Sequence, residues 1–271
     1  MSRSNPTAKN PAVRFMQWRG GAEAFKDDKG KTKHEGGKIT WYDKEAEEER
    51  EVALPFSFLV LDELNTITGF SEKDHSGFWS NEVRDLKNDK LVVKTKSGTV
   101  ASGVYEDIKE IVKAKGAKYT KSVYIAFKDE EGEMQIGHLK ISGAALTAWI
   151  EFQKKFDVMQ CAVQITDEPK LEKKGTNYYF SPVFEGQNVS EASDKAAKVL
   201  DEQLQQYLTT YLSRRPTETA DAEADEVVDD DVDEDENLDE EEDTQADESP
   251  AKPAPSKSKD EDKINLADVP F

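Results

Sequence analysis

Short runs of alternating apolar and polar residues, separated by glycine-containing turns, follow one another from residue 12 to residue 184. Alternation with a period of two is typical of β-strands that bury one face. The pattern predicts strands at 13–19, 38–42, 52–61, 66–70, 78–84, 91–96, 118–127, 134–141, 161–166 and 177–184.

Three segments carry apolar residues at helical spacing instead, which predicts helices at 104–115, 144–156 and 190–213. In the last of these, one stripe runs from Ala192 to Leu212, as expected of a helix that packs along its whole length. Ser190 is the expected N-cap, and Pro216 follows the end of the pattern.

Many short strands with a few helices indicate a mainly β (α+β) fold, a small and partly open barrel with inserted helices. The expected organisation begins with a flexible arm at 1–11 and a barrel domain at 12–188. A C-terminal helix at 189–213, an acidic linker at 214–263 and a terminal tip at 264–271 complete it.

The net charge of −20 is unevenly distributed along the chain. Residues 216–271 hold 23 Asp and Glu but only 4 Lys, a net charge of −19. Residues 1–215 hold 33 Lys and Arg against 34 Asp and Glu, a net charge of −1. Burial cannot offset the ordering entropy of so charged and aromatic-poor a segment, so we expect the tail to be disordered.

Other features of the sequence favour a cytoplasmic protein that does not contact a membrane. Cys161 is the only cysteine, so no intramolecular disulfide can form, which fits a reducing compartment. No apolar run approaches the ~18–20 residues that cross a bilayer. Residues 1–9 are polar and lack the apolar region of a signal peptide.

Two segments resemble parts of a nucleotide hydrolase, but neither has the right surroundings. Gly30-Lys31-Thr32 resembles the end of a phosphate-binding loop, yet the glycine needed five residues earlier is Phe25. Residues 58–63 (FLVLDE) resemble the apolar strand and acidic pair that hold magnesium. We interpret them as a core strand after which Asp62 and Glu63 begin a turn.

The cysteine and histidines, Cys161, His34, His75 and His138, are too scattered for a tetrahedral zinc site. Nothing local supports a nucleophile paired with a base. We therefore expect no enzymatic activity, no metal and no cofactor.

Aromatic residues lie close to Lys and Arg on several predicted strands. Bases of single-stranded nucleic acid stack on aromatic rings, while the backbone needs cations. The candidates for stacking are Trp18, Trp41, Tyr42, Phe78 and Tyr124. The candidates for phosphate contacts are Arg14, Arg19, Lys38, Arg84, Lys94, Lys96, Lys118 and Lys121.

For any one of these aromatics, a core position is at least as well supported as a binding role. Alternation puts Tyr119 and Val123 on a buried face, and Lys121 falls on that same face. Trp79 shares a face with Val83 and is assigned to the core. Tyr207 and Tyr211 lie on the stripe of the last helix and are interpreted as packing or oligomer contacts, which leaves a homo-oligomer open.

The tail ends in apolar residues, which a purely solubilising segment would not need. Ile264, Leu266, Val269 and Phe271 follow the acidic linker, and the chain ends on a free Pro-Phe carboxylate. Phe271 can fill an apolar pocket while its carboxylate meets a cation. We expect Asp268, Val269, Pro270 and Phe271 to bind a partner protein.

These features together resemble the single-stranded DNA-binding proteins encoded by bacteriophages. The resemblance covers most of residues 12–184 and the terminal DVPF, and it is carried by 54–64 (LPFSFLVLDEL), 78–83 (FWSNEV) and 116–124 (GAKYTKSVY). It implies an oligonucleotide-binding (OB-fold-like) barrel that coats and protects single-stranded DNA in the host cytoplasm. It also implies a tip that recruits replication, recombination and repair proteins, such as a polymerase, helicase, nuclease or recombinase.

Two rival functions remain. An acidic-tailed chaperone or DNA mimic would bind basic proteins through the charge of the tail. A nucleotide hydrolase or nuclease would use Lys31 and Asp62.

Overall fold

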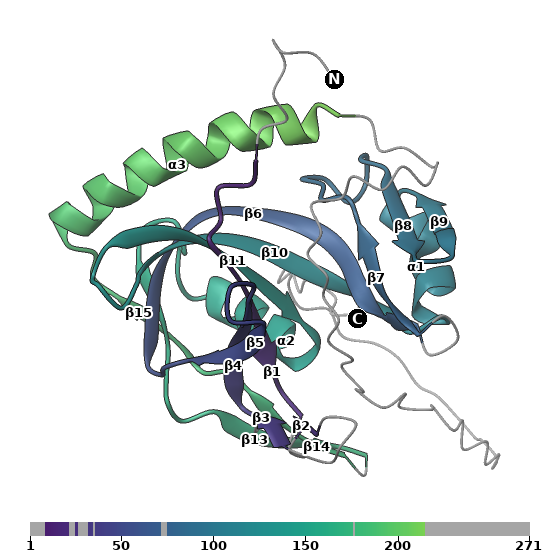
Figure 1. Cartoon of the computed structure of the whole chain (residues 1–271), viewed down its shortest axis with the longest axis horizontal. Helices are drawn as coiled ribbons and strands as arrows, with labels where there is room; N and C mark the ends of the chain where they lie inside the picture. Colours follow the sequence, from purple (N-terminus) through teal and green to yellow (C-terminus); the bar gives the residue numbers. More distant parts are fainter. Residues whose placement is uncertain are drawn as a thin grey trace, which may run out of the picture.

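The computed structural model describes residues 9–21, 25–26, 32–34, 36–71, 75–175 and 177–214. Strands predominate, and three α-helices accompany them in the part of the chain described (Figure 1). The predicted arm, acidic linker and tip lie outside these ranges, except for residues 9–11 of the arm and residue 214 of the linker.

A large mixed sheet forms the framework of the molecule. Its strands are ordered β5 (Glu48–Val52), β4 (Lys38–Asp43), β1 (Arg14–Arg19), β11 (Met134–Ser142), β10 (Ala117–Lys128), β6 (Phe56–Ser71), β7 (Ser76–Ser80), β8 (Leu91–Thr95) and β9 (Gly98–Gly103). Strand β12 (Ala162–Ile165) also pairs with β6 and with β15 (Phe184–Gln187). The sheet is curved and does not close into a barrel.

Strand β6 is the longest of the described strands, and it replaces the two strands predicted at 52–61 and 66–70. The predicted turn at Asp62 and Glu63 is wrong, because both residues lie inside β6 and pair with β10 across a bulge. The sequence suggests a break because two acidic residues interrupt an apolar run. The strand continues because each carboxylate finds partners on its own face of the sheet.

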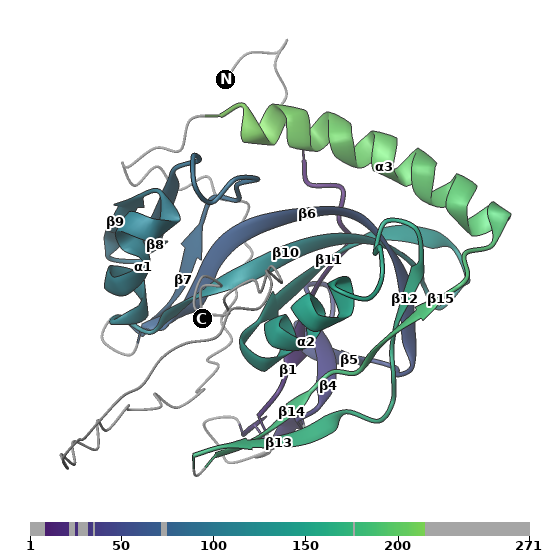
Figure 2. The same ribbon diagram turned by 180° about the vertical axis from the view of Figure 1, so that it is seen from behind.

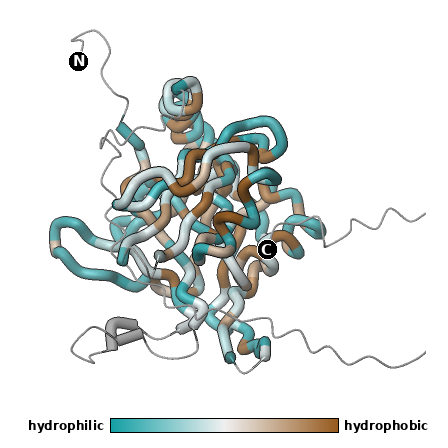
Figure 3. Tube along the Cα trace, turned by 90° about the vertical axis from the view of Figure 1, so that its right-hand side faces the viewer, coloured by the Kyte–Doolittle hydropathy of each residue, from teal (hydrophilic) through white to brown (hydrophobic). Residues whose placement is uncertain are grey.

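Two apolar cores lie on opposite faces of the sheet. The larger one fills the concave side, where Trp149 and Phe152 of α2 (Gly143–Gln153) pack against Phe58 and Val123. The second lies on the outer side, where α3 (Glu191–Leu212) crosses the sheet (Figures 1 and 2). The apolar segments consequently run through the middle of the molecule, with hydrophilic ones around them (Figure 3).

The third helix follows its sequence pattern closely. Ser190 is the predicted N-cap, and its hydroxyl accepts a hydrogen bond from the Ser193 amide at 3.1 Å. Leu204 and Leu208 are fully buried against the sheet, together with Leu64 and Tyr124. The part of the predicted stripe around Leu204 and Leu208 therefore packs on the sheet, whereas Val199, on the same predicted stripe, is exposed.

Strands β7, β8 and β9 form a small lobe with α1 (Tyr105–Lys113) beside the main curve of the sheet (Figures 1 and 2). Helix α1 covers one face of this lobe through Ile108 and Val112. The sequence pattern predicts the helix but not β9, whose residues GTVASG have no clear alternation.

A hairpin of β13 (Lys170–Lys174) and β14 (Asn177–Ser181) packs against the end of β1. The sequence predicted one strand at 177–184, whereas the structure divides this stretch into β14 and β15. Strands β5 and β13, which are rich in charged residues, were not predicted. The short pair of β2 (Phe25–Lys26) and β3 (Thr32–His34) completes the described elements. None of the described helices is long and apolar enough to cross a bilayer.

Candidate nucleic-acid interface

An exposed tryptophan and a lysine face each other across two strands of the small lobe. Phe78 of β7 points into the core beneath α1, so the next residue, Trp79, points to the opposite side. Trp79 is 39% exposed. Its cross-strand partner is Lys94 of β8, and such partners share one face of a sheet. An aromatic ring and an ammonium group are thereby held side by side on a surface that helix α1 does not cover.

The same face continues onto the main sheet. Gly69 of β6 lies opposite Phe78, so extending this register by one residue puts Thr68 beside Trp79. Thr68 in turn lies opposite Lys118 of β10. We call the surface formed by Trp79, Lys94, Thr68 and Lys118 the Trp79 face.

Hydroxyl groups stiffen the floor of the Trp79 face. The Thr68 and Thr120 hydroxyl oxygens are 2.6 Å apart, within one hydrogen bond. The Thr66 hydroxyl makes a similar contact with Ser80, at 3.0 Å. Lys96, which directly follows β8, is exposed. Three of the eight predicted phosphate contacts, Lys94, Lys96 and Lys118, therefore belong to this region or its edge.

Five of the predicted phosphate contacts form ion pairs with carboxylates elsewhere in the molecule. The pairs are Arg14 with Glu130, Arg19 with Glu49, Lys38 with Glu51, Arg84 with Asp62 and Lys121 with Glu63. A phosphate would have to compete with each of these carboxylates. The prediction for Arg19 is wrong, because its side chain is buried between β1 and β4 and contacts Thr40 as well as Glu49.

Two of the predicted stacking residues are core residues. Phe78 is 4% exposed and packs beneath α1, and Tyr124 is 1% exposed beneath α3. Neither ring can stack on a base. Alternation alone could not place Tyr124, because the face it occupies is covered by a helix from far along the chain.

The three remaining stacking candidates lie on β1 and β4. Trp18 is partly buried, and its indole N–H donates to the Phe180 carbonyl oxygen at 2.9 Å. Trp41 is covered by the Arg14 guanidinium, which lies 4.5 Å from its ring centroid. Tyr42 is exposed, but its cross-strand partner is Glu49 and its neighbour is Asp43. An acidic neighbourhood repels phosphate, so this part of the sheet is the poorer surface for nucleic acid.

The sequence reasoning missed Trp79 by assigning it to the core with Val83. That assignment requires one strand from residue 78 to residue 84, whereas β7 ends at Ser80. Val83 is buried and joins the sheet only through an isolated bridge to Asn65. The adjacent Phe78-Trp79 pair was the available signal, since one member of such a pair must face away from the core.

A buried serine, histidine and glutamate cluster resembles a hydrolytic triad in composition but differs from one in geometry. Ser122 and Glu82 both contact the same His138 nitrogen, Nε2, with the Glu82 oxygen 3.3 Å away. A triad needs the acid on the other nitrogen, and here Nδ1 has no hydrogen-bond partner. Ser122 is fully buried and also contacts Glu82, so no substrate can reach it.

The cluster is a structural one that ties β10, β11 and α3 together. The Tyr124 hydroxyl donates to Glu82 at 2.8 Å, and the Tyr124 and His138 rings stack with centroids 4.6 Å apart. The backbone N–H of Glu82 donates to the Tyr211 hydroxyl of α3 at 3.2 Å. Burial raises the pKa of Glu82, but hydrogen bonds from His138, Ser122 and Tyr124 outweigh it, and the net effect lowers that pKa.

The acidic pair that resembled a magnesium site is divided between the two faces of β6. Asp62 accepts hydrogen bonds from Arg84 at 2.6 Å and from Gln205 of α3 at 2.9 Å. Glu63 accepts from Trp149 and Gln153 of α2 at 2.8 and 3.0 Å. Burial raises the pKa of Asp62, but its bonds to Arg84 and Gln205 bring the pKa below its usual value. The two carboxylates cannot bind one metal ion.

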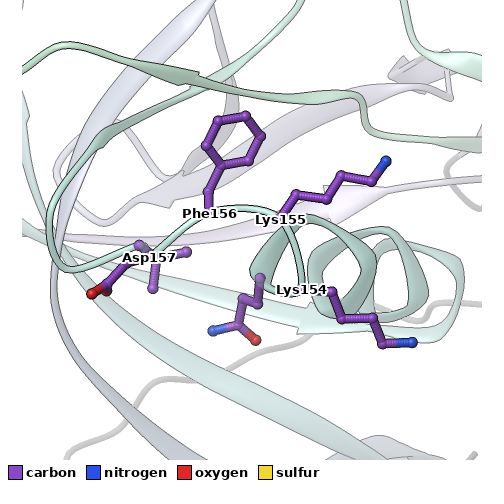
Figure 4. A pocket seen from close by; sticks show the side chains of 6 residues that line it. Lys154, Lys155, Phe156 and Asp157 are labelled. Atoms are coloured by element: carbon purple, nitrogen blue, oxygen red, sulfur yellow. The ribbon is translucent and has the colours of Figure 1, made fainter. Parts of the chain in front are cut away.

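The described residues contain no cluster of His, Cys, Asp and Glu that could hold a metal ion. A surface hollow follows the end of α2, lined by residues 153–158 (Figure 4). The side chains of Lys154, Lys155 and Asp157 point away from one another there, so they form no converging site (Figure 4). The phosphate-loop resemblance and the predicted tip lie outside the described residues, apart from the backbone of Thr32 in β3.

No protein-family model, curated protein or solved structure matches this chain. Its function therefore has to follow from the surfaces described above.

Proposed function

We propose that the protein binds single-stranded DNA through the Trp79 face and has no catalytic activity. The observation that carries the proposal is the exposed ring of Trp79 opposite Lys94, on a face that continues to Lys118. A base can lie on the indole ring while the phosphates on either side meet the two ammonium groups. Many copies bound in this way along one strand would coat and protect it. We assign this role to phage replication, recombination and repair.

The strand order supports the proposal. Strands β6, β10 and β11 form a meander that α2 follows, and β12 returns to pair with β6, as in a partly open Greek-key barrel. In OB-folds, the face of the second and third strands and the loop between the first two bind oligonucleotides. Here the small lobe occupies the connection between β6 and β10, and Trp79 lies on it in β7, which pairs with β6.

The charge of the body favours a single strand over a duplex. Residues 1–215 carry a net charge of −1, so they lack the bulk positive field of a duplex-binding protein. A ring held on a sheet face also needs an unstacked base, which a duplex does not offer. The interface therefore relies on stacking and a few local cations.

The test is binding to fluorescently labelled oligo-dT, followed by the anisotropy of the label, because Trp79→Ala removes the tryptophan at the interface. Trp79→Ala should weaken binding by ~1–3 kcal/mol, the usual contribution of one stacked base. Lys94→Ala and Lys118→Ala should each weaken binding and reduce the slope of log K against log salt by about 0.7.

Lys38→Ala is the matched control, because it removes a lysine that is paired with Glu51 away from the Trp79 face. Its binding and salt slope should stay near those of the wild type. The proposal fails if the wild-type protein does not bind oligo-dT at low salt. It also fails if Trp79→Ala and Lys38→Ala bind equally well.

The tail belongs to the same proposal. The tip at Asp268, Val269, Pro270 and Phe271 would recruit replication and recombination proteins to the coated strand, as the resemblance implies. Its apolar residues support this role over that of a chaperone or DNA mimic, which needs only the acidic charge.

A further inference from the structure

The β13–β14 hairpin presents a second surface with the chemistry of a nucleic-acid contact. Cross-strand pairing puts Leu171 opposite Phe180 and Lys173 opposite Tyr178, all on one face of the hairpin. Leu171 is 54% exposed and Tyr178 is 52% exposed. The Lys173 ammonium lies 4.9 Å from the centroid of the Tyr178 ring.

The hairpin is fixed at its base, so its exposed end is held in place. The Phe180 N–H donates to the Gly20 carbonyl oxygen at 2.6 Å, and the Phe180 carbonyl accepts from Trp18. Gly37, at φ +82°, lies directly beneath the Phe180 ring, where a Cβ atom would be 3.1 Å from that ring. These contacts at the base involve neither Leu171 nor Tyr178, which are both exposed.

We infer that this hairpin is a second contact for single-stranded nucleic acid, one that lengthens the binding site beyond the Trp79 face. Bases would stack on Tyr178 and pack against Leu171, while a phosphate would meet Lys173 on the same face. The inference rests on the proposed function, since it assigns a second surface to the same ligand.

Charge supports this ligand over a protein partner. The hairpin strands carry Lys170, Lys173 and Lys174 against one carboxylate, Glu172, which pairs with Lys170. Lys173 is exposed on the face that Leu171 and Tyr178 form, and Lys174 is exposed on the opposite face, on a body whose net charge is −1. Lysine is depleted in protein–protein interfaces, whereas it is the usual partner of a phosphate backbone.

The two surfaces lie in different parts of the molecule. The hairpin extends from the end of β1, while the small lobe stands beside the far end of β6 (Figures 1 and 2). A short oligonucleotide can occupy only one surface, and a long one can reach both. Length dependence therefore separates the hairpin from the Trp79 face.

The experiment compares the affinities of oligo-dT of about 6 and about 30 nucleotides, the first within and the second well beyond the roughly 4–16 nucleotides that a single OB-fold binds. In the full-length protein, the double substitution Leu171→Ala with Tyr178→Ala should weaken binding of the long strand about tenfold, as expected for one lost stacking contact. Binding of the short strand to the Trp79 face should change less than twofold. Lys173→Ala should reproduce the effect in part and lower the salt dependence.

Ile111→Ala is the control, because it removes an exposed apolar residue of α1 and should leave both affinities unchanged. The inference is overturned if the hairpin variants bind the long strand as tightly as the wild type does. It is also overturned if their affinities for the short and the long strand fall by the same factor, or if the variants change only the oligomeric state. If Trp79→Ala has no effect while the hairpin variants still weaken binding of the long strand, the Trp79 face is not the binding site and the hairpin remains a nucleic-acid contact.

Discussion

At the scale of single residues, Glu82 is a buried carboxylate whose oxygens contact several donor groups. It is only 10% exposed, and it is surrounded by the hydroxyls of Ser122 and Tyr124 and by His138. Burial and the negative charge of Glu82 both raise the pKa of Tyr124, so its phenol stays protonated and remains a donor. An acceptor that holds donors from two strands fixes the positions of both.

The ionised form of Glu82 should contribute to stability above its ordinary pKa of 4.5, because the folded protein lowers that pKa. This contribution should be lost as the pH falls through the folded-state value. Glu82→Gln should therefore lower the free energy of unfolding at pH 7 by about 1–3 kcal/mol, the cost of an unsatisfied buried polar group. Urea unfolding at pH 7 and at about pH 3.5 should show the difference from wild type shrinking in acid. A difference that is the same at both pH values would contradict this account.

At the scale of elements, α3 acts as a cover for the outer face of the sheet. Leu204 and Leu208 are fully buried, and Gln205 between them donates to Asp62 of β6. Tyr211 adds a hydrogen bond to the backbone of Glu82. The helix is thus attached to the sheet by apolar contacts along its middle and by polar contacts at two points.

Leu204→Ala should lower the free energy of unfolding by 2–5 kcal/mol, the usual cost of removing a buried leucine side chain. Val199→Ala on the same helix is the control, since Val199 is 67% exposed and should change stability by less than about 0.5 kcal/mol. Thermal or chemical unfolding measures both. Equal stabilities for the two variants would mean that α3 does not pack on the sheet.

Elements with a clear local pattern could be predicted from the sequence, and those that depend on distant partners could not. The stripe and N-cap of α3 lie within one segment, so the helix and the Leu204–Leu208 part of its packing face were predicted, but the exposure of Val199 was not. The continuity of β6 through Asp62 and Glu63 depends on Arg84, Gln205 and Trp149, which are remote in sequence.

The contrast between local patterns and distant partners also explains which residues of the candidate interface could be predicted. Lys94, Lys96 and Lys118 were predicted as phosphate contacts because lysines on strands are visible in the sequence. Trp79 was assigned to the core because its exposure depends on where β7 ends and on which face α1 covers. Tyr124 was assigned to the surface because α3, far along the chain, is what buries it.

At the scale of the whole molecule, charge divides the chain into a nearly neutral body and a strongly acidic tail of residues 216–271. A tail with a net charge of −19 repels phosphate wherever it lies near the Trp79 face, and salt screens that repulsion. The tail should therefore weaken DNA binding most at low ionic strength.

Deletion of residues 216–271 should increase the affinity for oligo-dT at low salt, and the gain should fall as salt approaches about 1 M, where the screening length is about 3 Å. Deletion of residues 269–271 alone is the matched control, because it removes Val269, Pro270 and Phe271 and no charged side chain. This shorter deletion should leave DNA affinity unchanged and abolish the recruitment of partner proteins. Binding titrations across a salt series, with pull-down of host replication proteins by DNA-bound protein, measure both effects. Recruitment that survives the short deletion but not the long one would assign the partner contact to the acidic linker, and the tip would lose its proposed role.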